Sequence, residues 1–255
     1  MSRSEHARRE GTGTVGDLAD GSLRMPFRYA FHHQVPDEFI RLPEPTSSEG
    51  WREAMARLMP GSDEEQQDTA SNGLRSQLPH LQDRENVVLT AMCIGTEEAD
   101  GDERLSLALL AITVRPSEHG PAQRVFTAEG IYRATEQKLF AAEDTDDLEE
   151  LDFRLGKGVQ GRQDMLLAAK LPCGPAVMTT SLRTLRLPAL EGGILVPPLA
   201  MATLQLIAPA PYGYCVYVTI STPSVFLLDS YSARLAHIGR TLTFDKLEAP
   251  PAQEA

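Results

Sequence analysis

Two neighbouring stretches decide the fold, Met201–Ala208 (MATLQLIA) and Tyr214–Ile220 (YCVYVTI). Apolar side chains recur at every second position of both, which is the period of a strand with one buried face. The PAPYG sequence between them, residues 209–213, is too rich in proline and glycine to continue a ladder. The pattern therefore predicts an antiparallel hairpin. Its buried face is expected to carry Ala202, Leu204, Leu206 and Ala208, and Tyr214, Val216, Val218 and Ile220.

The hairpin is followed by a segment with the pattern of an amphipathic helix. Thr222 is suited to cap the helix, and Pro223 is suited to its first position, where a missing N–H costs little. Gly239 is placed as a C-terminal stop, and residues 241–244 are predicted to return to the sheet as a short strand. Such a helix must cover the apolar face of the sheet. Its stripe is Val225, Leu228, Tyr231, Leu235 and Ile238.

Length and composition indicate one folded domain with polar ends. The chain has 255 residues, and 42% of them are hydrophobic, which is enough for a sizeable core. We expect a disordered leader over residues 1–26, where glycines interrupt any helix, and a disordered tail over residues 247–255. Residues 27–246 are expected to form a single α+β domain.

Charge and cysteine content limit the partners and the compartment. The formal net charge is −12, and no cluster of Lys and Arg offers the basic surface that nucleic acid or anionic lipid requires. Cys93, Cys173 and Cys215 are too few and too scattered for a disulfide framework. No apolar run resembles a signal peptide or a membrane span. We therefore expect a cytoplasmic protein with no nucleic-acid partner and no membrane insertion.

The rest of the chain supplies further strands and helices to the same architecture. Helices are expected to begin at Ser47 or Ser48 and, through a capping box, at Ser62 with Glu65. Together the expected elements predict a mostly antiparallel sheet of about six or seven strands flanked by helices, which is an α/β/α sandwich of the α+β class. The expected strands are 27–31, 40–43, 87–94, 104–114 and 176–187, with 95–103 as a polar loop, and the expected helices are 49–59, 62–78 and 128–141.

Two loop sequences have superficial matches to ligand-binding motifs. Residues 156–161 (GKGVQG) match GxGxxG, but no strong strand precedes them, and no acid lies between Asp164 and Glu191 to bind a ribose. The acidic tract at 143–152 could offer oxygens to Ca²⁺, but Glu149 stands where an EF-hand loop needs glycine. We interpret the first as a flexible loop and the second as a solvated surface.

Isolated reactive residues give no complete site. Cys173 lies in a Pro-Cys-Gly-Pro turn and would need a neighbouring base to act as a nucleophile. His32 and His33 are adjacent on a predicted strand, so they point to opposite faces and make a poor chelate. Ser221 lacks a GxSxG context. No catalytic, cofactor-binding or metal-binding residue is assigned, and no cofactor is expected.

Several phrases in one order are similar to a known family. They are Val35-Pro36 with Phe39, then Arg41-Leu42-Pro43, a helix with Trp51, the LPCGPAV sequence of Leu171–Val177, and Ser221-Thr222-Pro223. This order resembles the Mog1/PsbP-like α/β/α sandwich family, in small proteins of actinobacterial type, over residues 27–246. The resemblance implies an antiparallel sheet flanked by helices and, in most relatives, a non-enzymatic role in binding and assembly of larger protein machines. It implies no catalytic or ligand residue.

Three hypotheses of function remain. The first is a non-enzymatic cytoplasmic module that binds another protein or assists its assembly. The second is a small hydrophobic-ligand-binding protein, which needs an apolar pocket with a few convergent polar groups. The third is an enzyme that uses Cys173 or a histidine.

Overall fold

The computed structural model describes residues 31–44, 46–82, 86–99, 101–140, 164–185, 199–211 and 213–245. The predicted leader and tail lie outside these residues, and so do the acidic tract and the GKGVQG sequence. Phe27 and Tyr29 of the first predicted strand lie outside them as well. These predictions are therefore not taken further.

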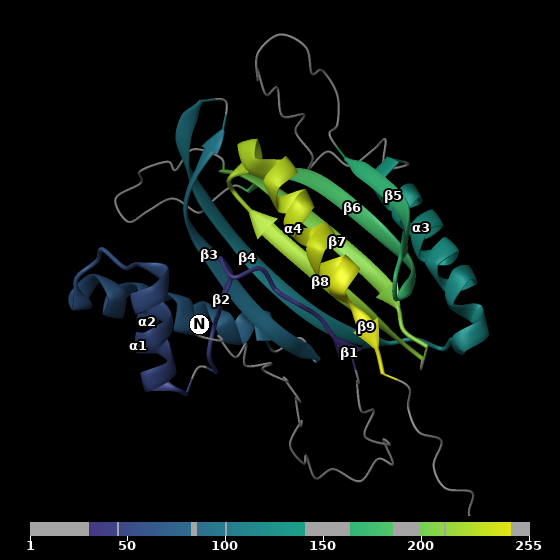
Figure 1. The fold of residues 1–255 in the computed structure, drawn as a ribbon, viewed down its shortest axis with the longest axis horizontal. Coiled ribbons are helices and arrows are strands. Elements are labelled where there is room, and N and C mark those ends of the chain that lie inside the picture. Colours follow the sequence, from purple (N-terminus) through teal and green to yellow (C-terminus); the bar gives the residue numbers. More distant parts are fainter. Residues whose placement is uncertain are drawn as a thin grey trace, which may run out of the picture.

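A seven-stranded antiparallel sheet forms the centre of the molecule (Figure 1). Every neighbouring pair of strands in it is antiparallel, so the prediction of an α+β fold with a mostly antiparallel sheet is confirmed. In spatial order the strands are β2 (Ile40–Arg41), β3 (Val87–Ala99), β4 (Asp102–Pro116), β8 (Tyr214–Thr222), β7 (Leu199–Pro209), β6 (Gly174–Leu185) and β5 (Met165–Leu171).

The predicted C-terminal hairpin is present as β7 and β8. Leu204 lies opposite Ile220, and Leu206 lies opposite Val218, so the alternating apolar residues of both strands share one face. All four side chains are fully buried. Burial of this kind contributes about 1.5–3 kcal/mol for each large apolar side chain.

The helix that covers this face, α4 (Leu228–Thr241), begins later than predicted. Thr222 still belongs to β8, and a short 3-10 helix (η2, Val225–Leu227) precedes α4. The prediction that Thr222 caps the helix is therefore wrong, because the Thr222 hydroxyl instead donates to the Leu107 carbonyl at 2.6 Å. The predicted stripe is confirmed, and its buried members within α4 are Tyr231, Leu235 and Ile238.

Gly239 lies inside α4, so its predicted role as a stop is also wrong. A Cβ at this position would lie 2.9 Å from Cδ2 of Leu206 and 3.3 Å from Cδ1 of Leu171. The absence of a side chain therefore allows the helix to approach both strands closely. The helix ends at Thr241, and Leu242 is already extended.

The last strand does not return to the main sheet, contrary to the prediction. β9 (Thr243–Phe244) pairs with β1 (Phe31–His32) in a separate two-stranded sheet. Figure 1 shows this small sheet at one end of α4.

β3 and β4 form a hairpin much longer than predicted. Their pairing continues to Ala99 opposite Asp102, so residues 95–99 and 102–103 of the predicted polar loop are strand. The hairpin extends past β8, whose last paired residue on β4 is Ser221, opposite Leu109. Figure 1 shows it as a projecting arm.

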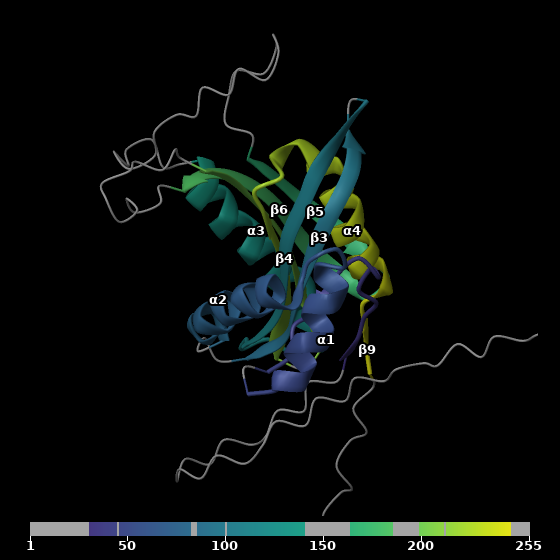
Figure 2. The ribbon, with the colours of Figure 1, turned by 90° about the vertical axis from the view of Figure 1, so that its left-hand side faces the viewer.

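The remaining helices lie on the face opposite α4 (Figure 2). The predicted helix with Trp51 is confirmed as α1 (Ser48–Leu58), capped by Ser47. The next helix, α2 (Glu64–Gln82), is capped by Asp63 rather than Ser62, and it continues past the predicted end near Leu78. Asp63 Oδ1 accepts from the Gln66 amide at 2.8 Å, which makes the capping box one residue later than predicted.

The opposite face is covered in two parts. The Trp51 cluster joins α1 to strands β2 and β3 and is formed by Ile40, Leu42, Trp51, Ala54, Met55 and Leu58. The third helix, α3 (Arg124–Phe140), crosses β5, β6 and β7. The layering is therefore helix, sheet and helix, as the α/β/α prediction requires.

Candidate functional site

Cys173 serves the structure of a turn. It stands between β5 and β6, and its carbonyl accepts a hydrogen bond from Arg124 Nη2 at 2.6 Å. Burial raises the pKa of the Cys173 thiol, and the nearby Arg124 charge does not outweigh this effect. The thiolate that a nucleophilic mechanism needs is therefore less populated at neutral pH than in a free cysteine.

Arg124 is the residue that organises this end of the molecule. Its Nε donates to the Pro209 carbonyl at 2.7 Å, and its guanidinium lies 5.3 Å from the centre of the Phe244 ring. Gly174 has a φ of +129°, and a Cβ there would meet Arg124 Nη2 at 2.6 Å. One side chain thus ties the start of α3 to the ends of β7, β9 and the β5–β6 turn.

The two adjacent histidines have different surroundings. His32 Nε2 lies 3.0 Å from the Asp245 carboxylate. The ring of His33 lies 5.6 Å from that of Phe31, and burial, followed by the charges of Arg41 and His32, lowers the pKa of His33. Within the residues that the structure describes, no group of three or more His, Cys, Asp or Glu is placed to hold a metal ion.

Ser221 lies within a continuous strand. It is half-buried and stands opposite Leu109 on one side and Thr203 on the other. It therefore does not occupy the sharp strand-to-helix turn of a nucleophile elbow.

A polar network that sequence reasoning missed joins the β3–β4 hairpin to α4. The Glu97 carboxylate accepts hydrogen bonds from Ser106 and Ser230 and lies 2.9 Å from Arg234 Nη2. The Ser106 hydroxyl also lies 2.8 Å from the Tyr231 hydroxyl. The Glu97–Ser230 hydrogen bond of this network joins residues 133 positions apart in the chain. No local motif could have revealed it.

The electrostatics of this network favour an ionised Glu97. Burial alone would raise the pKa of Glu97, but hydrogen bonds from Ser106, Ser230 and Arg234, together with the Arg234 charge, hold it below its ordinary value. Burial raises the pKa of Tyr231, so its phenol stays protonated. The carboxylate is therefore already satisfied by its neighbours, which suits a structural role.

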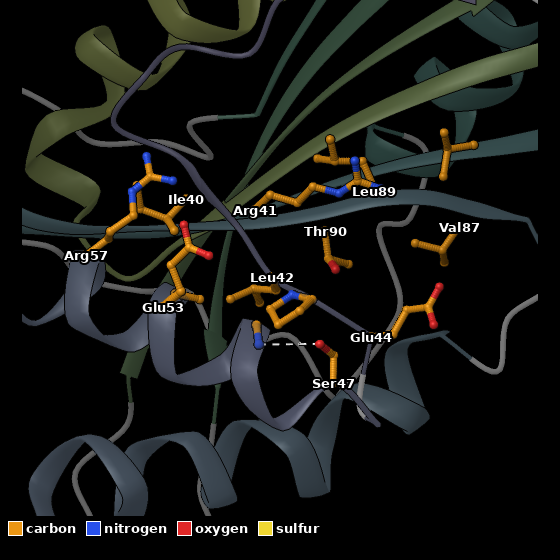
Figure 3. A pocket seen from close by; sticks show the side chains of 14 residues that line it. Ile40, Arg41, Leu42, Glu44, Ser47, Glu53, Arg57, Val87, Leu89 and Thr90 are labelled. Atoms are coloured by element: carbon orange, nitrogen blue, oxygen red, sulfur yellow. Dashed lines mark hydrogen bonds between the residues drawn. The ribbon is translucent and has the colours of Figure 1, made fainter. Parts of the chain in front are cut away.

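A hollow of about 550 Å³ lies between α1 and the start of β3 (Figure 3). Charged side chains of both signs, Arg41, Glu44, Glu53 and Arg57, line it together with apolar ones such as Leu89. All four charged residues are exposed. Ligand sites for hydrophobic molecules are enclosed and mostly apolar. This open hollow has a different character.

The start of α3 exposes large apolar side chains to solvent. Arg124 and Ala128 face the sheet, so the residues between them turn outward with the 3.6-residue period of the helix. Val125 is 62% exposed, and Phe126 is 72% exposed, the largest value among the exposed large hydrophobic residues of the described chain. Ala122 beside them is exposed as well. We call these residues the α3 apolar surface: Pro121, Ala122, Val125 and Phe126.

The chain was compared with known proteins. No protein-family model matches it, and no curated protein matches it. Within the described residues, no helix is both long enough and apolar enough to cross a membrane. The geometry of the surfaces therefore carries the functional argument.

Sequence reasoning did not single out the α3 apolar surface. The predicted helix began at Ala128, whereas α3 begins at Arg124 and is preceded by a 3-10 turn (η1, Pro121–Gln123). The available signal was Pro121 at a first helical position, with Gln123 able to bond back to the Gly120 amide. Such a start would have placed Val125 and Phe126 on the helix.

Proposed function

We propose that the protein is a non-enzymatic interaction module that binds another protein through the α3 apolar surface. The observation that carries this proposal is the exposure of Phe126, at 72%, beside Val125, at 62%. Single exposed apolar residues are common, but two adjacent large ones on the outer side of a helix form a patch. Aromatic anchors of this kind dominate the binding energy of many protein interfaces.

The chemistry of the surface describes the partner. Covering Phe126 in an apolar pocket contributes about 1.5–3 kcal/mol, and Val125 adds to it. The chain carries a net charge of −12, so a partner with a basic rim around its pocket is favoured during encounter. Glu129 and Arg133, which pair at 2.6 Å on the next turn, offer a polar rim on this side.

The surface also suits a rigid docking element. Arg124 bonds to Pro209 and Cys173, so the first turn of α3 is held in one position before a partner arrives. Preorganisation of this kind reduces the entropy lost on binding. A cytoplasmic location and a Mog1/PsbP-like scaffold are parts of the same proposal, supported by the acidic composition and by the order of sequence phrases described above.

Site-specific photocrosslinking tests this proposal. A photoreactive phenylalanine analogue replaces Phe126 in one variant and Phe226 in a matched control. Phe226 is also exposed, at 41%, but it lies on η2, where its ring contacts Arg104 of β4. After illumination in an extract of the cells that naturally make the protein, we expect one stoichiometric adduct from position 126 that is absent from position 226.

The identified partner then allows a quantitative test. Phe126→Ser should weaken binding about 10–100-fold, the equivalent of the buried phenyl ring. Phe226→Ser should leave the affinity unchanged. The proposal fails if position 126 gives no adduct, gives the same adducts as position 226, or crosslinks to a second copy of this chain.

Neither the hollow beside α1 nor the face beneath α4 suits a hydrophobic ligand. The hollow beside α1 is bordered by Arg41 and Arg57 and by Glu44 and Glu53, so it presents charges to an occupant. The face beneath α4 is filled by side chains such as Leu206, Leu235 and Ile238, which are almost completely buried.

A further inference from the structure

β5 is a border strand of the seven-stranded sheet, and its residues are not part of the α3 apolar surface. β5 pairs with β6 along its entire length, from Met165 opposite Thr180 to Leu171 opposite Gly174. Among the described residues no strand pairs with its other edge, which forms one border of the sheet (Figure 1). Such an edge presents a row of backbone donors and acceptors to any strand that can reach it.

The side chains of β5 do little to discourage pairing. Met165 is 43% exposed and Leu167 is 46% exposed. Proteins usually protect free edges with charges, prolines, bulges or short strands. β5 has seven residues, a register without a bulge, no proline, and Lys170 as its one charged side chain. As far as the described part of the chain is concerned, the edge is therefore open to a partner strand.

The charge around β5 allows it to pair with the same edge of a second copy. The chain contains 36 acidic residues, yet residues 165–185, which span β5 and β6, contain none. The excess negative charge lies on other parts of the chain. Two copies can therefore bring their β5 edges together without placing carboxylates opposite each other.

We propose that β5 pairs with β5 of a second copy of this chain, antiparallel about a two-fold axis at Ala168. This register is self-complementary, as a two-fold interface requires. It places Leu167 opposite Ala169 of the second copy, and Met165 opposite Leu171 of the second copy. Large side chains thus face smaller or apolar ones on the side of the sheet that carries α4.

The charged residue also fits this register. Lys170 lies opposite Leu166 of the second copy, and the two Lys170 side chains stand at opposite ends of the pairing. Like charges directly opposite each other in a ladder are destabilising, and this register avoids them. Ala168, which is exposed, faces its own counterpart at the axis.

The size of the contact sets its strength. A stable specific interface buries about 1,600 Å² in total, and a pairing of two seven-residue strands supplies less than that. The dimer is therefore reversible and depends on concentration. The sheet becomes continuous across both copies, with seven strands from each.

Disulfide trapping tests the register. Residues directly opposite in an antiparallel ladder have Cα atoms about 4.5–5.5 Å apart, within the range that a disulfide spans. Ala168→Cys should crosslink to itself under mild oxidation. A mixture of Leu166→Cys and Lys170→Cys chains should give the mixed dimer faster than either chain gives its own. Ala134→Cys, an exposed position on α3, is the matched control.

Analytical ultracentrifugation of the full chain tests the association itself. We expect the wild-type sedimentation coefficient to rise between about 1 μM and about 1 mM. Ala168→Lys, which sets two lysines opposite each other at the axis, should shift the midpoint upward at least tenfold while the circular dichroism spectrum stays unchanged. Phe126→Ser should leave the midpoint unchanged, which separates this surface from the α3 apolar surface.

Three results would overturn the proposal. They are a wild-type chain that stays monomeric over the whole range, a dimer that Ala168→Lys does not weaken, and crosslinking at Ala134→Cys that is as fast as at Ala168→Cys. The first would also be the result if β5 receives a strand from a different protein.

Discussion

Two strand edges of the sheet contrast with each other: the part of β4 that lies beyond the end of β8, and the outer edge of the border strand β5. On the β3–β4 side, hydroxyl groups occupy the edge of β4 where β8 stops: Ser224 Oγ donates to the Leu105 carbonyl at 2.8 Å and accepts from the Leu107 amide at 3.1 Å. Thr222 bonds to the Leu107 carbonyl as well. On the β5–β6 side, the outer edge meets no strand of the described chain, and its apolar residues Met165 and Leu167 are exposed.

The two edges have different roles in one sheet: the first stabilises the fold, and the second is available for association. Side chains that satisfy backbone groups at an edge remove the possibility of adding a strand there, and they hold the long hairpin in place. An edge without such side chains remains available to another chain. The closed side should therefore respond to mutation by losing stability, and the open side by losing association.

The largest effect is expected from Trp51→Ala on the closed side. Trp51 is 1% exposed, and its indole N–H donates to the Glu44 carbonyl at 3.0 Å. Removing it leaves a cavity in the Trp51 cluster, and the expected loss is about 3–5 kcal/mol. Urea denaturation followed by circular dichroism measures it. A loss below about 1 kcal/mol would show that this side is not closed by α1.

Glu97→Gln should be the next in size. The change removes the closer of the two carboxylates beside the Arg234 guanidinium, which is 12% exposed, and leaves only the longer contact to Glu38 at 3.6 Å. A charge-assisted hydrogen bond contributes about 1.5–3 kcal/mol, so the expected loss at neutral pH is about 2 kcal/mol. Glu98→Gln, on the neighbouring exposed residue, is the control and should be nearly neutral.

The effect of Glu97→Gln should depend on pH in one direction. The pKa of Glu97 is lowered in the folded protein from 4.5, so its stabilising contribution is complete above that pH and is lost as the pH falls through the lower folded value. The difference between wild type and Glu97→Gln should therefore shrink in acid. A difference that grows as the pH falls would contradict the assignment.

Ser224→Ala should have a smaller effect that is local to the arm. Ser224 is 3% exposed, and its loss leaves the Leu105 carbonyl and the Leu107 amide without their partner. The expected cost is about 1–2 kcal/mol. Hydrogen exchange of the Leu107 amide should accelerate. Equal acceleration in Ser48→Ala, an exposed serine of α1, would indicate a non-specific effect.

The smallest effect is expected from Leu167→Ala on the open side. At concentrations where the chain is monomeric, a side chain that is 46% exposed should contribute about 0.5–1 kcal/mol or less. Leu42→Ala is the matched change on the closed side, where Leu42 is 4% exposed, and it should cost about 2–5 kcal/mol. Equal losses at the two positions would remove the distinction between the sides.

Much of the sheet could be predicted from the sequence because its signals are local. The β7–β8 hairpin and the apolar stripe of α4 follow from periods of two and of three to four residues, and both are confirmed. The predicted start of α4 is wrong because the side chain expected to cap the helix makes a tertiary contact in the folded protein. Thr222 has the chemistry of a helix cap, but in the folded chain its hydroxyl bonds to a strand 115 residues away.

The functional surfaces were harder to predict, because each depends on which residues stay uncovered. The local sequence around Phe126 does not distinguish it from a buried phenylalanine. Its exposure depends on the contacts of Arg124, which decide which side of α3 faces the sheet. The sequence pattern does not assign residues 164–171 to a strand, and the place of β5 at the border depends on the order in which the seven strands assemble.

The pairing of β1 with β9 brings the two ends of the described chain together. Phe31 lies opposite Phe244, and His32 contacts Asp245 across 213 positions of sequence. During synthesis, β1 must therefore wait until β9, 213 positions later, has left the ribosome before its partner exists. The same closeness allows the ends to be joined by a short linker and the chain to be reopened at Gly101, the tip of the β3–β4 hairpin, as a circularly permuted protein with the same contacts.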